Sequence, residues 1–177
     1  MTAKDNLKSF ADLLFCNDSA AILDLRAAVE NWEEFYRANE DALNVDLDWQ
    51  KKVWGDNPRL WEIVIDIGHL HHYLFEADWR EEYQDIVDGL QELKPCSELE
   101  IDWNLLAETD PEIPINDFMQ SIATALAAHG TTLVILDKAS DSYPLAILND
   151  AVVSDAEEFA RQIEDARLVI VSRTEIN

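Results

Sequence analysis

Residues 131–148, TTLVILDKASDSYPLAIL, decide the fold of this chain, because two strand-like runs stand there close together. Thr131–Leu136 and Tyr143–Leu148 are apolar runs of strand length, and the residues between them are the Asp, Lys and Ser that turns favour. This pattern predicts a hairpin. Pro144 would place the start of the second run at a sheet edge, because proline cannot donate to a ladder. A further apolar run at 168–171, LVIV, predicts a last strand.

The chain before this hairpin predicts helices, since apolar residues recur there at helical spacing and the whole sequence has only four Gly and five Pro. Asp18 or Ser19 can cap a helix that runs to about Ala42. Residues 59–77 are apolar nearly all round, which predicts a central buried helix in which Gly68 packs closely against a neighbour. The remaining predicted helices are a short one through Leu7 and Leu14, a segment at 47–54, one at 79–93, and one that Asn116 or Asp117 caps and Gly130 closes.

The fold class predicted from these elements is α+β, in a single domain spanning 1–177. About five helices, in a helical subregion at 1–130, would pack with a small mixed or antiparallel sheet in a β-rich subregion at 131–177. Ser154 and Glu157 fit a capping box for a helix before the last strand. Residues 97–107 stay open between strand and helix, because their first half alternates apolar and acidic residues and Leu105-Leu106 breaks the alternation.

The composition is that of a folded but very acidic protein. Of 177 residues 48% are hydrophobic, with six Trp, six Phe and four Tyr, which is enough for a substantial core. The formal net charge is −24, so the fold is halophilic, merely very soluble, or matched to a cationic partner. Direct binding to nucleic acid or to an anionic membrane is excluded, because both need clustered Lys and Arg.

The amino terminus does not resemble a signal peptide, because Asp12 interrupts its apolar run and Asn17 and Asp18 follow directly. No apolar run approaches the length that spans a bilayer. Cys16 and Cys96 show neither metal-type nor redox-type spacing and are expected to be reduced packing residues. These points together predict a cytoplasmic protein.

Residues 76–112 hold 13 acidic residues, which only Arg80 and Lys94 oppose. Apolar residues are interleaved with these acids, so the stretch predicts a fixed negative surface on a folded segment and not a solvating tail. Aromatic residues amid charge suit a protein interface, although such a charge run can equally be a solvated face. The predicted partner-binding residues are Glu76, Asp78, Trp79, Glu81, Glu82, Tyr83, Asp85, Asp88, Glu92, Glu98, Glu100, Asp102 and Trp103.

Other motifs point only weakly to chemistry. His69 and His72 would share a helical face with Asp66 and Glu76 one turn away, which is the alternative hypothesis of a metal-binding enzyme or regulator. The HExxH spacing is absent, and histidines that hydrogen-bond a neighbouring helix account for the same pattern. No Gly-rich phosphate loop and no nucleophile elbow is present. The sequence therefore predicts no enzymatic activity, no cofactor and no metal.

Three segments resemble, in the same order, a family of uncharacterised bacterial cytoplasmic domains. They are Glu76-Ala77-Asp78-Trp79, Ile101-Asp102-Trp103, and residues 133–148, LVILDKASDSYPLAIL. The likeness covers roughly residues 60 to 150, and the family supplies no catalytic residues to carry over. In size and charge the chain is also similar to the immunity proteins of bacterial toxin systems, including contact-dependent growth inhibition. That second resemblance implies a protein that caps a basic nuclease toxin.

The function expected from the sequence is therefore non-enzymatic binding of a basic protein, in its narrower form an immunity protein that neutralises a nuclease toxin domain. Carboxylates would steer the partner to the surface, and buried aromatic anchors would set the lifetime of the complex.

Overall fold

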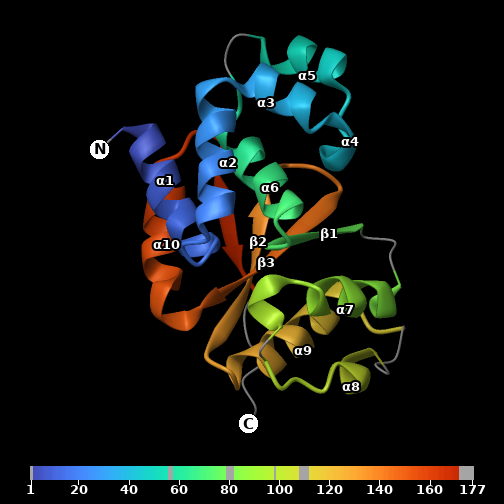
Figure 1. Cartoon of the computed structure of the whole chain (residues 1–177). Coiled ribbons are helices and arrows are strands. Elements are labelled where there is room, and N and C mark those ends of the chain that lie inside the picture. Colours follow the sequence, from blue (N-terminus) through green and yellow to red (C-terminus); the bar gives the residue numbers. More distant parts are fainter. Residues whose placement is uncertain (1, 56–57, 79–81, 98, 108–111, 172–177) are drawn as a thin grey trace.

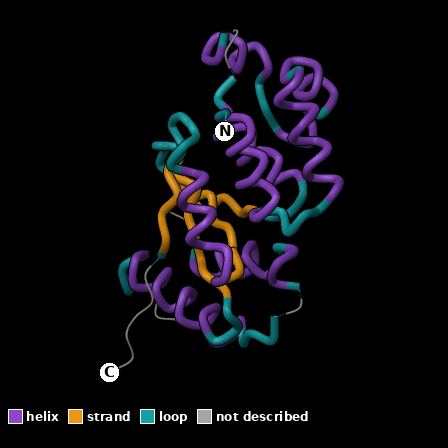
Figure 2. Tube along the Cα trace, turned by 90° about the vertical axis from the view of Figure 1, so that its left-hand side faces the viewer, coloured by secondary structure: helices purple, strands orange, loops and turns teal. Residues whose placement is uncertain are grey.

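The computed structural model describes residues 2–55, 58–78, 82–97, 99–107 and 112–171. It confirms the predicted α+β class. A small sheet lies at the centre, and helices cover both of its faces (Figures 1 and 2). In the described ranges, no helix has the length and apolar character that crossing a membrane requires.

The described residues form one antiparallel four-stranded sheet in the order β1-β3-β2-β4. The predicted hairpin is its centre, and the predicted last strand is one of its edges, so both predictions are confirmed. The strands are β1 (Leu74–Asp78), β2 (Thr131–Asp137), β3 (Ser142–Asn149) and β4 (Arg167–Ile170).

Both faces of β2 and β3 are buried, which explains why their sequences are continuously apolar. Successive residues of a strand point to opposite faces, so Leu133 and Leu145 enter one hydrophobic cluster while Val134 and Ala146 enter the other. The sheet therefore separates two cores, each covered by its own helices.

The first core is covered by most of the helices of the amino-terminal half together with the last helix, and the second by the helices between β1 and β2 (Figure 1). Helices of the first side are α1 (Ala3–Leu14), α2 (Ser19–Glu30), α3 (Trp32–Ala38), α4 (Glu40–Leu43), α5 (Leu47–Trp54), α6 (Leu60–Leu70) and α10 (Val153–Ala160). Those of the second side are α7 (Tyr83–Gln91), α8 (Trp103–Ala107) and α9 (Ile115–Ala127), and short 3-10 turns lie at Lys94–Cys96 and Asp150–Val152.

The predicted central helix at 59–77 is wrong in its second half. Helix α6 ends at Leu70, His72 takes a left-handed conformation with φ +59°, and β1 follows. β1 therefore lies inside the subregion predicted to be helical. The close packing predicted at Gly68 is confirmed, because a Cβ placed there would lie 1.9 Å from Leu74 Cδ1.

The predicted edge position of Pro144 holds only for the start of β3: the strand as a whole lies between β1 and β2, but its first residues pair with β1 alone. Pro144 stands opposite Glu76 of β1, while the β2–β3 ladder ends at the pair Ile135–Leu145. A residue without an N–H is tolerated in a central strand here because it lies one position beyond the β2 ladder.

The helix predicted from Asp18 to Ala42 is divided into α2, α3 and α4. Asn31 leaves helical geometry at φ −148°, and Asn39 separates α3 from α4. The break turns α3 toward α5, so that the Trp32 ring lies 5.2 Å and the Tyr36 ring 5.4 Å from the ring of Trp54.

Among the predicted N-terminal caps, that of Asp18 is confirmed: its carboxylate accepts hydrogen bonds from the N–H groups of Ala20 and Ala21. The left-handed Gly130 predicted after the helix at 116–130 is confirmed as well, at φ +69°. The capping box at Ser154 is wrong, because α10 starts directly from the 3-10 turn that Asn149 caps. The cap at Asn116 or Asp117 is wrong as well, since α9 begins after Pro114 without a side-chain cap.

Two smaller points of the sequence are also resolved. Segment 97–107, which the sequence left open between strand and helix, ends in helix α8, and none of the described residues of this segment is in a strand. Both cysteines are free thiols; Cys96 is buried as expected, whereas Cys16 is exposed.

Candidate functional site

The strongest charge asymmetry of the chain lies in its middle third. Residues 76–130 hold 14 acidic and two basic residues, whereas 1–75 hold 14 and seven, and 131–177 hold nine and four. The middle third supplies most of β1 and all of α7, α8 and α9, and these three helices lie together below β1 in Figure 1. The excess of carboxylates is therefore concentrated on one part of the fold.

Seven of the predicted partner-binding acids are described and exposed, and we call this set the acidic surface. In the described part of the chain no Lys or Arg pairs with an acid of α7 or of the segment before α8. The set can therefore attract Lys and Arg side chains of another molecule and accept hydrogen bonds from them. Its members are Asp78, Glu82, Asp85, Asp88, Glu92, Glu100 and Asp102.

Helix α7 holds the centre of the acidic surface in place through its amphipathic sequence. Ile86 and Leu90 are fully buried in the second core, which fixes the rotation of the helix. Asp85, Asp88 and Glu92 follow one another at intervals of three and four residues, so they form one outward stripe. The burial of the apolar face thus determines where the carboxylates point.

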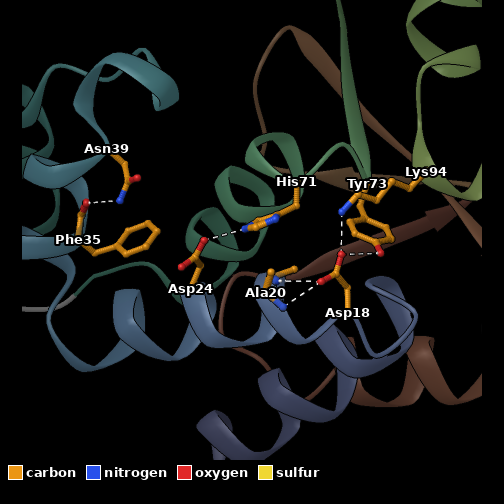
Figure 3. A network of polar contacts seen from close by, with 9 residues as sticks. Asp18, Ala20, Asp24, Phe35, Asn39, His71, Tyr73 and Lys94 are labelled. Carbon is orange, nitrogen blue, oxygen red and sulfur yellow. Dashed lines mark hydrogen bonds and ion pairs between the residues drawn. The ribbon is translucent and has the colours of Figure 1, made fainter.

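Lys94, the described base within this middle third, is held by the first side of the molecule. Its Nζ atom lies 2.7 Å from Asp18 Oδ2 and 5.0 Å from the centroid of the Tyr73 ring. Figure 3 shows the Lys94 side chain reaching Asp18 beside Tyr73. The hydrogen bond from Lys94 lowers the pKa of Asp18 to about 2. Lys94 therefore neutralises the start of α2 and pairs with no acid of α7 or of the segment before α8.

The aromatic residues predicted as contact points support the surface from within. Tyr83 stacks on Phe118 with ring centroids 4.0 Å apart and donates a hydrogen bond to the carbonyl oxygen of Ile113. Trp103 is 8% exposed and belongs to the second core. These rings anchor α7 and α8 and offer little area to a partner. The predicted residues Trp79, Glu81 and Glu98 lie outside the described residues.

Glu76 is set apart from the acidic surface by its own contacts. It is half-buried in β1, its Oε1 atom lies 2.5 Å from Lys138 Nζ, and it accepts a hydrogen bond from Ser142. Its Oε2 atom lies 3.3 Å from His69 Nε2, a distance typical of a charge contact, although the two are not aligned as a hydrogen bond. His69 chiefly, with Lys138 and Ser142, lowers the pKa of Glu76 to about 2.

Asp66 lies next to this cluster at the first core. Tyr36 donates a hydrogen bond of 2.5 Å to Asp66 Oδ2. Burial raises the pKa of Asp66 to about 6, against the opposing effects of the Tyr36 hydrogen bond and the nearby His69. The network therefore contains two carboxyl groups whose pKa values are shifted in opposite directions.

The alternative metal site does not assemble as its spacing predicted. His69 meets Glu76 and lies near Asp66, but His72 is exposed beyond the end of α6, so the shared helical face is lost. Among the described residues no group of three or more His, Cys, Asp and Glu side chains is arranged to hold a metal ion.

Sequence reasoning missed Tyr36, Lys138 and Ser142 as members of the polar network. No local pattern could reveal them: Lys138 and Ser142 reach Glu76 because β1 pairs with β3, and Tyr36 meets Asp66 from 30 residues away. A sequence that predicts a helix at Glu76 gives no reason to pair it with the turn after β2.

Comparison with curated proteins and with solved structures finds no match in either set. The model of one protein family, described as a domain of unknown function (DUF6630), matches residues 6–165, a span that includes both cores, the sheet up to the start of β4, and the acidic surface. The chain therefore belongs to the DUF6630 family of domains of unknown function.

Proposed function

We propose that this protein is a non-enzymatic binding protein whose acidic surface docks a basic protein partner. The observation that carries the proposal is the concentration of 14 acidic against two basic residues in 76–130, together with the engagement of Lys94 by Asp18. A rigid array of carboxylates accelerates encounter with a cationic surface and fixes its orientation.

The narrower form of the proposal is an immunity protein that caps a nuclease toxin. A nuclease needs Lys and Arg around its active site to hold phosphates, and an array of carboxylates can occupy the same positions. Residues on α7 and before α8 would then be the contact points, and inhibition would follow from blocking access of the substrate.

A triple charge reversal on the acidic surface tests the proposal. Asp88→Lys, Glu92→Lys and Glu100→Lys, which we call the acidic triple, change exposed residues; Glu92 is the C-cap of α7, but only its backbone makes the cap hydrogen bonds. The matched control, the dispersed triple, is Asp141→Lys, Glu158→Lys and Glu164→Lys, exposed residues outside the middle third that give the same change in net charge.

Proteins that bind the wild-type chain in an extract of its own cells are identified by mass spectrometry, and their association rates are measured at several salt concentrations. We expect the acidic triple to slow association with a basic partner roughly tenfold or more at low salt and to flatten its salt dependence, while the dispersed triple has a smaller effect. Equal binding by both triples at every ionic strength would contradict the proposed surface. If the partner is a nuclease, suppression of its activity by the wild-type protein distinguishes the immunity role from simple binding.

A further inference from the structure

A groove between α1 and α2, on the opposite side of the sheet from the acidic surface, combines an apolar lining with basic residues. It encloses a volume of ≈ 400 Å³. Leu7 and Leu25, both almost completely buried, lie at its base, and the partly buried side chains of Ile22 and Val29 complete its apolar lining. The volume and the apolar lining are those of a small-molecule site.

Three cations border this groove. Lys4, Lys8 and Arg26 line it, are exposed, and form no ion pair within the described part of the chain. Of the other described Lys and Arg residues, only Arg37 and Lys52 are similarly unpaired. Three of the five described bases that form no ion pair are thus gathered at one apolar groove, in a protein of net charge −24.

The acids of the groove do not cancel this charge. Asp5 caps α1, where its carboxylate accepts hydrogen bonds of 2.7 and 2.9 Å from the N–H and hydroxyl groups of Thr2, and these contacts lower its pKa. Glu30 is the other acid of the lining. Three cations therefore face two acids, one of which is already engaged by the helix cap.

We propose that the α1–α2 groove binds a small amphiphilic anion, with an unbranched or aromatic apolar body and a single carboxylate. The apolar body would displace water from the leucine base, and the carboxylate would contact Lys8 and Arg26 at the rim. The charge of the whole molecule selects for a single negative charge, because a net charge of −24 repels a polyanion more strongly than a monoanion. A short polar anion would leave the apolar lining uncovered.

This site is independent of the proposed docking of a basic protein. It lies on helices of the first core, and it requires positive charge where the acidic surface requires negative charge. Loss of one function by mutation therefore leaves the other measurable in the same protein.

Decanoate is a suitable probe. Decanol has the same apolar chain without the charge, and acetate has the same carboxylate without the apolar chain. We expect titration calorimetry to show decanoate binding with one site, at least about tenfold tighter than decanol or acetate. In methyl NMR spectra of the full chain, decanoate should shift the resonances of Leu7, Ile22, Leu25 and Val29. Shifts confined to other parts of the molecule, or equal affinity for decanoate and decanol, would overturn the proposal.

Charge-reversal variants provide the second arm. Lys8→Glu with Arg26→Glu should weaken decanoate binding about tenfold or more. Arg37→Glu with Lys52→Glu makes the same change in net charge at two described bases that form no ion pair and lie outside the groove, and it should alter binding less than about twofold. Equal losses in the two double variants would show that net charge alone governs binding and would refute the site. The NMR mapping on the wild-type protein decides the question even if a variant fails to fold.

Discussion

At the scale of single residues, Asp66 and Glu76 belong to one polar network but affect stability in opposite ways. The folded protein lowers the pKa of Glu76 from 4.5 to about 2, so Glu76 contributes stability above pH 4.5 that is lost as the pH falls toward 2. Burial raises the pKa of Asp66 from 3.8 to about 6, so its charged form costs stability above pH 6, and the cost is relieved as the pH falls toward 3.8.

Asp66→Asn tests this assignment. The amide can still accept the hydrogen bond of Tyr36 but carries no charge, so the variant should be more stable than the wild type at pH 7 by on the order of 2 kcal/mol. At pH 4.5 the difference should be much smaller, because the folded wild type is then protonated at Asp66. Urea unfolding at the two pH values measures the effect, with Asp141→Asn in the exposed turn as a control. A difference that does not change with pH would show that Asp66 is not the buried titrating group.

The sequence predicted the hydrogen-bond partner of a side chain well only where that partner is a near neighbour in the chain. Asp18 caps α2 through the N–H groups of Ala20 and Ala21, two and three residues away, and that cap could be read from the sequence. Glu76 finds Lys138 and Ser142 more than 60 residues away, so no spacing rule could assign it to the polar network and remove it from the acidic surface.

At the scale of elements, β1 is held between two helices that each place a glycine against it. Gly68 of α6 lies against Leu74, and Gly89 of α7 lies against the Phe75 ring, where a Cβ would come within 2.2 Å of Cε2. Leu74 and Phe75 point to opposite faces of the sheet and pack in different cores. The absence of two side chains thus lets α6 and α7 approach the strand from both sides.

Gly68→Ala and Gly89→Ala should therefore each destabilise the protein, by about 1–3 kcal/mol, although alanine favours helix formation. Reducing the neighbour relieves the overlap, so Gly68→Ala with Leu74→Ala, and Gly89→Ala with Phe75→Leu, should each lose less stability than the sum of their two single variants. Urea denaturation of single and double variants measures the coupling. Additive losses in both double variants would show that close approach is not the reason for the glycines.

The same strand explains where prediction of the elements failed. The hairpin β2–β3 could be predicted because its turn residues and both strands are contiguous in sequence. Residues 74–78 continue an apolar run that begins in α6, and neither Gly nor Pro separates them from it, so the local pattern favours one long helix. Their extended form depends on the ladder with β3, which pairs Leu74 with Ala146, and that contact is invisible to local reasoning.

At the scale of the whole molecule, the predicted acidity is present, but its arrangement depends on the fold. The sequence predicted an uninterrupted row of carboxylates with aromatic contacts, whereas the fold draws Glu76 into a polar network, buries Trp103 and ties Lys94 to Asp18. The remaining acids on α7 and before α8 face solvent without a described cation beside them. Their mutual repulsion opposes folding, and salt should relieve it.

The stability of the protein should accordingly rise with salt, and the acidic surface should account for more of this rise than its share of the charge. We expect Tm to increase between about 0.02 and 0.5 M NaCl, where the Debye length falls from roughly 20 Å to a few Å. The acidic triple, Asp88→Lys, Glu92→Lys and Glu100→Lys, should raise Tm at low salt and reduce the salt dependence. The dispersed triple, with the same change in net charge, should do so less, because its three residues lie outside the middle third where acids outnumber bases sevenfold. Differential scanning calorimetry of the wild type and the two triple variants in parallel separates the effect of net charge from the effect of the local concentration of carboxylates. Equal effects of both triples would mean that the carboxylates repel one another as an evenly distributed charge, and the concentration on which partner docking depends would then be absent.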